Sequence, residues 1–242
     1  MTDSIPDRAR HLVERSEAAG LPARALGGAA IALRCPSAAS GPLRRPLHDL
    51  DLITASRTAF ELGRLLEQLG YRPEARFNAL HGHSRMLFTG PEELHLDLLV
   101  GDFQMCHRLS LRERLTLDPL TLTLADLLLT KLQIAQLNRK DATDVAAILL
   151  DHELGTGGAG VDLPYVTGLL SSDWGWWRTV TANLDLLPSV LPEDLDDASR
   201  SRIVGQAAAL RTAVDGRQKS LAWRMRARVG DRIPWRQDPE EV

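Results

Sequence analysis

The apolar residues change their periodicity near Leu120, and this change constrains the fold more than any other feature. Before Leu120, short alternating segments predict strands at Leu47 to Thr54, Arg85 to Thr89 and Leu94 to Val100. After Leu120 the spacing is helical, apart from a glycine-rich break at residues 155–160. A strand-rich first part followed by helices predicts an α+β fold, and no repeat suggests a solenoid or a coiled coil.

We therefore expect two parts, a mixed sheet with flanking helices over residues 1–154 and a helical C-terminal region over residues 161–242. Leucines at i, i+3, i+4 and i+7 from Leu62 predict an amphipathic helix that ends at Gly70. The other expected elements are a helix at 8–19, a helix-prone run that follows the glycine pair within residues 25–34, a loop at 37–46 and a strand at 71–77.

Composition indicates a globular protein with a sizeable core. The 242 residues are 44% hydrophobic and 25% charged, and the net charge of −3 predicts no strong attraction of the whole molecule to nucleic acid. No run approaches the roughly 20 apolar residues of a membrane span, and the N-terminus is charged, so we expect a soluble cytoplasmic protein. Cys35 and Cys106 lack metal-type spacing and are expected to be free buried thiols.

Three acids interrupt the apolar strands. Asp49 and Asp51 are two residues apart, so both carboxylates project from the same face of their strand, where they would repel each other without a cation. Asp97 is a third acid in the later strand, and pairing of the two strands would complete an oxygen-ligand cluster suited to Mg²⁺. The alternative is that Asp49 is a turn or capping residue and Asp97 an edge-strand acid. A Gly27-Gly28 pair ahead of a helix-prone run adds a candidate phosphate site.

These motifs resemble the nucleotidyltransferase superfamily, in which the glycines receive triphosphate and the three aspartates hold catalytic metal. The resemblance covers about residues 24–150 and is greatest to the abortive-infection, toxin-type bacterial nucleotidyltransferases. Their later motifs would be Lys131 and the Asp141-x-x-Asp144 box. The gap between the glycines and the aspartate pair is longer than many relatives show, and Ile134 stands where a small residue is expected.

Helical spacing independently marks Lys131 as unusual, because it falls within the apolar stripe of its predicted helix. Its stem either snorkels to solvent or its ammonium meets a phosphate or carboxylate. Asp141 and Asp144 are either helix caps or site residues, and Asp144 is the better candidate because only one residue can be the cap. Arg44 and Arg45 precede the aspartate pair, where they would contact triphosphate or remain solvated.

The C-terminal region is rich in arginine, with ten basic residues between Arg200 and Arg236 and with Trp223 and Trp235 among them. These cations either neutralise nearby acids such as Asp185 and Glu193 or form a surface for RNA phosphates and bases. The first interpretation is favoured because the overall charge is negative.

The expected activity is that of a metal-dependent nucleotidyltransferase, which moves a nucleoside monophosphate from a nucleoside triphosphate to a hydroxyl acceptor. Asp49, Asp51 and Asp97 would hold Mg²⁺ or Mn²⁺ and act in catalysis with Lys131. The expected nucleotide-binding residues are Gly27, Gly28, Arg45, Lys131 and Asp144, and ATP is an expected nucleotide. Three classes of acceptor stay open: RNA, a protein and a small molecule. An RNA acceptor, including tRNA, would bind through residues 200–236. A protein partner such as an antitoxin is also left open. The alternative function is a non-catalytic nucleotide-binding or interaction protein that keeps the fold.

Overall fold

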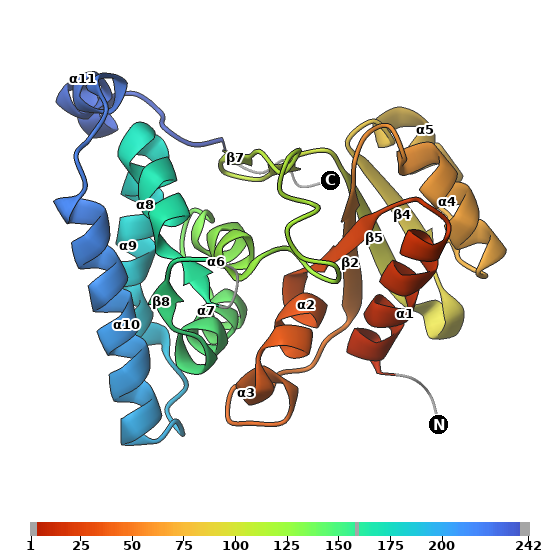
Figure 1. Ribbon diagram of the computed structural model, residues 1–242, viewed down its shortest axis with the longest axis horizontal. Helices are drawn as coiled ribbons and strands as arrows, with labels where there is room; N and C mark the ends of the chain where they lie inside the picture. Colours follow the sequence, from red (N-terminus) through yellow and green to blue (C-terminus); the bar gives the residue numbers. More distant parts are fainter. Residues whose placement is uncertain (1–3, 158–159, 238–242) are drawn as a thin grey trace. The chain divides into compact units, whose positions relative to one another are not determined.

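The computed structural model describes residues 4–157 and 160–237 (Figure 1). The chain forms two compact units. The first comprises residues 1–34, 46–103 and 109–123, and the second comprises residues 35–45, 104–108 and 124–242. The last segment of the first unit ends at Thr123. Lys131 and Asp144 therefore belong to the unit of the later helices, whereas the sequence prediction placed them with the α/β core.

A five-stranded mixed sheet forms the centre of the first unit, in the order β1-β2-β5-β4-β3. Strands β2 and β5 are parallel neighbours, whereas β1 on β2, β4 on β5 and β3 on β4 are antiparallel. The strands are β1 (Ala23–Leu26), β2 (Asp49–Thr54), β3 (Arg72–Pro73), β4 (Arg85–Thr89) and β5 (His95–Val100). The helices of this unit are α1 (Ile5–Ala18), α2 (Gly27–Arg34), α4 (Ala59–Gln68), α5 (Ala75–His81) and the 3₁₀ turn η1 (Pro91–Glu93).

Alternation along β2 and β5 gives the sheet one apolar and one polar face. Leu50 and Leu52 share a face with Leu96 and Leu98, and all four side chains are buried. Helix α4 covers this face, because a methyl group at Gly63 would lie 3.6 Å from the side chains of β4. The intervening positions carry the acids, so burying one face of the sheet leaves the acids together on the other.

The second unit is built from helices, which explains the helical periodicity after Leu120. Its long elements are α6 (Leu124–Leu132), α7 (Arg139–Asp151), α8 (Leu163–Ser172), α9 (Trp174–Val190), α10 (Asp197–Gly216) and α11 (Leu221–Val229). Its short elements are α3 (Pro36–Ala39), β8 (Leu154–Gly155), β9 (Val161–Asp162) and η2 (Gly230–Arg232), and β6 (Phe103–Gln104) pairs with β7 (Arg108–Leu109). Helices α6 and α7 pack on each other through fully buried leucine, valine and isoleucine side chains.

The α+β prediction is confirmed, and the strand predicted at Arg85 to Thr89 is observed with those bounds. The strand predicted over residues 71–77 is wrong: only Arg72–Pro73 is extended, and helix α5 begins at Ala75. Pro73 has no N–H to continue a ladder, and the Asn78 side chain pairs with the backbone N–H and C=O of Leu87 in place of a strand. The predicted loop at 37–46 contains the end of the one-turn helix α3. Cys35 and Cys106 are buried and form no disulfide, as predicted.

Candidate functional site

The first group of candidate residues lies on the polar face of the sheet in the first unit. Asp51 pairs in register with Asp97 across the parallel strands β2 and β5, and Asp49 pairs with His95 one step earlier on the same face. Strands in a sheet are about 4.8 Å apart, so the Asp51 and Asp97 carboxylates start from adjacent backbone positions. The sheet register therefore brings together two acids that are 46 positions apart in the sequence.

Gly27 closes one side of Asp51. Leu26 on β1 pairs with Asp51, so the chain turns into helix α2 directly beside that carboxylate. Gly27 has a φ of +67°, and a methyl group on its α-carbon would lie 1.9 Å from Asp51 Oδ2. Both the backbone conformation and the close approach require glycine here. The first turn of α2 thus begins beside the Asp51 carboxylate.

Arg85 on β4 provides the cation of this face. Its Nε donates to Asp97 Oδ1 at 2.6 Å and its Nη2 to Asp97 Oδ2 at 2.7 Å, a bidentate ion pair. The hydrogen bond to Asp97 raises the pKa of Arg85, as do the charges of Asp97 and Asp51. The guanidinium also lies 5.8 Å from the ring centroid of Phe77 on α5. The sequence prediction did not single out Arg85. The available signal was strand alternation, which places Arg85 on the face of the sheet that carries the acids.

The donor set fits a metal ion only in part. Mg²⁺ in nucleotide sites takes one or two carboxylates and completes its shell with waters and phosphate oxygens. Asp51 and Asp97, adjacent in register, suit that role. A cage supplied wholly by the protein does not fit: in the described part of the chain no group of three or more histidine, cysteine, aspartate or glutamate residues could hold a metal ion. Asp49 is the exposed member of the predicted trio, at the start of β2.

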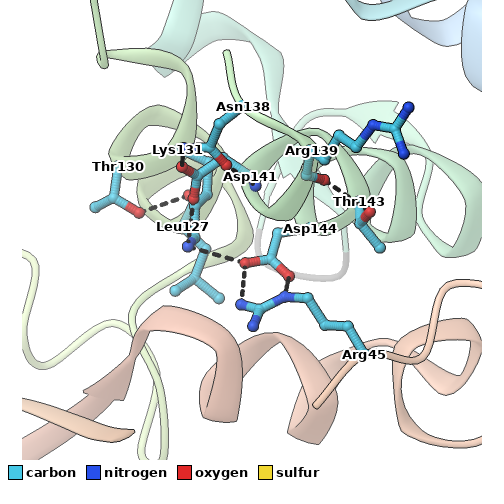
Figure 2. Close-up of polar contacts among 9 residues, drawn as sticks. All are labelled: Arg45, Leu127, Thr130, Lys131, Asn138, Arg139, Asp141, Thr143 and Asp144. Atoms are coloured by element: carbon cyan, nitrogen blue, oxygen red, sulfur yellow. Dashed lines mark hydrogen bonds and ion pairs between the residues drawn. The ribbon is translucent and has the colours of Figure 1, made fainter. Parts of the chain in front are cut away.

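The second group of candidate residues forms an ion network in the second unit, drawn in Figure 2. Asp144 on α7 accepts two hydrogen bonds from Arg45, from Nε at 2.8 Å and from Nη2 at 2.7 Å. Lys131 on α6 lies 2.9 Å from Asp144 Oδ2 and donates to Asp141 Oδ1 at 2.8 Å. The side chain of Lys131 is 15% exposed and that of Asp144 only 4% exposed. Lys131 thus lies in the apolar stripe, as its spacing predicts, and contacts two carboxylates.

The network balances two cations against two anions. Burial opposes the charged form of Lys131, but Asp144 and Asp141 hold its pKa above the usual lysine value. Burial likewise opposes ionisation of Asp144, but hydrogen bonds and charge from Arg45 and Lys131 hold its pKa below the usual range. Lys131 and Asp144 are therefore charged at neutral pH, and the network ties the segment that contains Arg45 to α6 and α7.

The hydrogen bonds at the start of α7 show which residue caps the helix. Asn138 is the N-cap, because its side chain accepts from the backbone N–H of Asp141 at 3.0 Å. Asp141 accepts instead from Asn138 Nδ2, at 2.6 Å, and from Lys131. The capping interpretation of Asp141 is therefore wrong. Asp144 pairs with Arg45 and Lys131.

The arginine-rich C-terminal residues are engaged with other groups of the second unit. Arg226 lies 4.6 Å from the ring centroid of Trp174 and donates to the carbonyl of Gly230 at 2.7 Å. Arg211 lies 3.4 Å from Asp185 in the acidic stretch and also pairs with Asp215. A cavity of about 690 Å³ in this unit is lined by Trp174, Trp223, Trp235, Arg226 and Arg236, among others.

Comparisons with known proteins identify no family for this chain. No family model matches the sequence, and no curated protein matches it. Among solved structures, the chain is similar to an antigenic nucleotidyltransferase-like protein from Paracoccidioides brasiliensis, with a TM-score of 0.41 and 13% sequence identity over 91% of this chain and 96% of that chain. A likeness at that level supports no conclusion about activity. In the described part of the chain, no helix is long and apolar enough to cross a membrane.

Proposed function

We propose that this chain is a nucleotidyltransferase that moves a nucleoside monophosphate from a nucleoside triphosphate to a hydroxyl acceptor. One observation carries the proposal: Asp51 and Asp97 are in register on adjacent parallel strands, and the α-carbon of Gly27 at the start of α2 lies against the Asp51 carboxylate. A carboxylate pair beside a helix N-terminus offers ligands for a divalent cation next to backbone N–H groups for phosphate.

Each residue has a defined part in this proposal. Asp51 and Asp97 would ligate a Mg²⁺ or Mn²⁺ ion that accompanies the nucleotide, with Asp49 at the exposed edge of the same face. When bound, the ion would neutralise negative charge that develops on the phosphoryl oxygens. Gly27 and Gly28 would receive the triphosphate through the first turn of α2. A nucleotide-contacting role for Arg45, Lys131 and Asp144 is implied by the family resemblance alone; within the second unit both cations pair with Asp144.

The proposed reaction is an in-line displacement. The acceptor hydroxyl oxygen forms a bond to the α-phosphorus, and the bond from the α-phosphorus to the oxygen bridging to the β-phosphate breaks. Pyrophosphate leaves with that electron pair, and the hydroxyl proton passes to a base, a role that we assign to Asp97. Holding the reactants in line and stabilising the phosphoryl charge would supply most of the rate.

A second candidate function is nucleotide binding without turnover. It is favoured by one specific observation, the bidentate pairing of Arg85 with both oxygens of Asp97. A guanidinium that stays on Asp97 places a positive charge beside any metal ion and disfavours protonation of that carboxylate, so permanent pairing would leave a phosphate-binding face with a weak metal site and a poor base.

Incubation of the purified protein with each α-labelled nucleoside triphosphate, Mg²⁺ or Mn²⁺ and total cell extract tests the proposal. Fractionation into RNA, protein and small molecules then identifies the acceptor class. We expect label in one fraction, its loss with a metal chelator and its loss in Asp51→Asn. Asp194→Asn, which changes an exposed acid of the second unit, is the matched control and should label normally. Turnover retained in folded Asp51→Asn would refute the assignment, and nucleotide binding without any label would favour the second candidate.

A further inference from the structure

We propose that Arg85 is an exchangeable counter-ion that sets the metal affinity of the Asp51–Asp97 pair. In this view Arg85 neutralises Asp97 while the site is empty and releases it when a metal-bound nucleotide enters. The inference rests on the proposed function, because it concerns the ion that Asp51 and Asp97 would ligate.

The first step is that Arg85 and a metal ion would use the same oxygens. Both oxygens of Asp97 accept from the guanidinium, at 2.6 Å and 2.7 Å. A metal ion ligated by Asp97 must take at least one of these oxygens. The charge of Asp51 also acts on the Arg85 guanidinium, so its positive charge lies within range of both members of the pair. The oxygens keep further lone pairs, so the competition is electrostatic: two cations on one carboxylate repel each other, and each weakens the binding of the other.

The second step is that the ion pair is accessible enough to exchange. The side chain of Arg85 is 38% exposed and that of Asp97 is 23% exposed, in contrast with Asp144, which is 4% exposed. A half-exposed pair costs little to separate, because water solvates both partners. The aromatic face of Phe77 lies 5.8 Å from the guanidinium and gives Arg85 a second favourable contact on the same side of the sheet.

The third step is the charge that exchange leaves behind. Asp51 and Asp97 are neighbours in register, so their carboxylates repel each other, and a cation on Asp97, whether Arg85 or a metal ion, lowers that repulsion. Once displaced from Asp97, the guanidinium would remain near the site as a cation available to phosphate oxygens. Arg85 would thus weaken binding of the metal ion alone and favour binding of the metal ion together with a triphosphate.

The test is direct titration of the purified full chain with Mn²⁺ alone, with free Mn²⁺ measured by electron paramagnetic resonance. This readout requires no nucleotide and no turnover. We expect Arg85→Gln to bind Mn²⁺ roughly five- to tenfold more tightly than the wild type, the size expected when a partly exposed competing ion pair is removed. Arg72→Gln is the matched control, because Arg72 forms an exposed ion pair with Glu93 at 2.9 Å in the same sheet, and it should leave the affinity unchanged. Asp51→Asn should weaken binding.

Each outcome decides the matter. Equal Mn²⁺ affinities for the wild type and Arg85→Gln would overturn the role of Arg85 and leave the proposed function intact. Absence of Mn²⁺ binding in the wild type and in every folded Arg85 variant would overturn the metal-dependent function and the inference with it. Arg85→Lys is a second variant should the glutamine substitution fail to fold: lysine keeps the charge but loses the bidentate fork, so its Mn²⁺ affinity should lie between those of the wild type and Arg85→Gln.

Discussion

Acidification from pH 7 to pH 5 should destabilise the second unit through one histidine, His107. Its ring is buried, stacks on Trp176 at 5.0 Å between centroids, and its Nε2 lies 2.8 Å from the Thr179 hydroxyl. Burial lowers the pKa of His107 to about 4, with the charge of Asp173 opposing the shift and that of Arg236 adding to it. The folded protein therefore holds this ring neutral at a pH where the unfolded chain protonates it.

The magnitude follows from proton linkage. A base with a depressed pKa contributes its full stability above its unfolded pKa of 6.5 and loses it as the pH falls toward the folded value. Between pH 7 and pH 5 the loss is about 1.8 kcal/mol when the pKa falls from 6.5 to about 4, and it approaches about 3 kcal/mol below pH 4.

Urea unfolding of the wild type, His107→Gln and His11→Gln at each pH measures this loss. His11 is exposed on α1, so its substitution should leave the pH dependence of the wild type in place. The glutamine variant at residue 107 should show a shallower fall in the free energy of unfolding, by about 1.8 kcal/mol over this range. Identical slopes for the wild type and His107→Gln would show that burial does not depress this pKa.

Two further substitutions test the candidate sites. Gly27→Ala should cost at least about 1–2 kcal/mol from its positive φ, and more than Gly20→Ala, because Gly20 has a φ of +71° with open space around it whereas a methyl group at Gly27 meets Asp51. Equal losses in urea unfolding would contradict the close packing of Gly27 on Asp51. Asp144→Asn should cost about 3 kcal/mol, because it leaves the buried cations of Arg45 and Lys131 short of a partner, and Asp194→Asn should cost close to nothing. A loss below about 1 kcal/mol for Asp144→Asn would show that solvent reaches the network.

The sequence predicted the elements that hold the acids because strand alternation is a local signal. Leu50, Leu52, Leu96 and Leu98 mark one buried face, and burying them leaves the acids on the opposite face whatever the rest of the chain does. The register that places Asp51 beside Asp97 is not local. It depends on which strands are neighbours, and the sequence supplied only a condition, that the two strands pair.

The residues that the sequence missed depend on contacts over long sequence separations. Arg85 became relevant only when β4 paired antiparallel with β5 and placed its guanidinium on Asp97. Asn138 was overlooked as the cap of α7 because Asp141, in the first turn, satisfies the same sequence signal. Asp144 pairs with Arg45, which precedes it by 99 positions, so no local sequence pattern indicates this ion pair.

Charge balance on the acidic face leads to a last prediction: a bound metal ion should restore the stability that is lost when Arg85 is replaced. Without metal, Arg85→Gln leaves Asp51 and Asp97 adjacent with no guanidinium on Asp97, so its melting temperature should fall below that of the wild type. Excess Mn²⁺ stabilises a folded protein in proportion to the logarithm of its affinity, so a tenfold tighter site gives Arg85→Gln about 1.4 kcal/mol more stabilisation than the wild type receives. Thermal unfolding with and without saturating Mn²⁺ measures both effects, and Arg72→Gln again serves as the control. Equal Mn²⁺ shifts in the wild type and Arg85→Gln would mean that the guanidinium and the metal ion do not compete for Asp97.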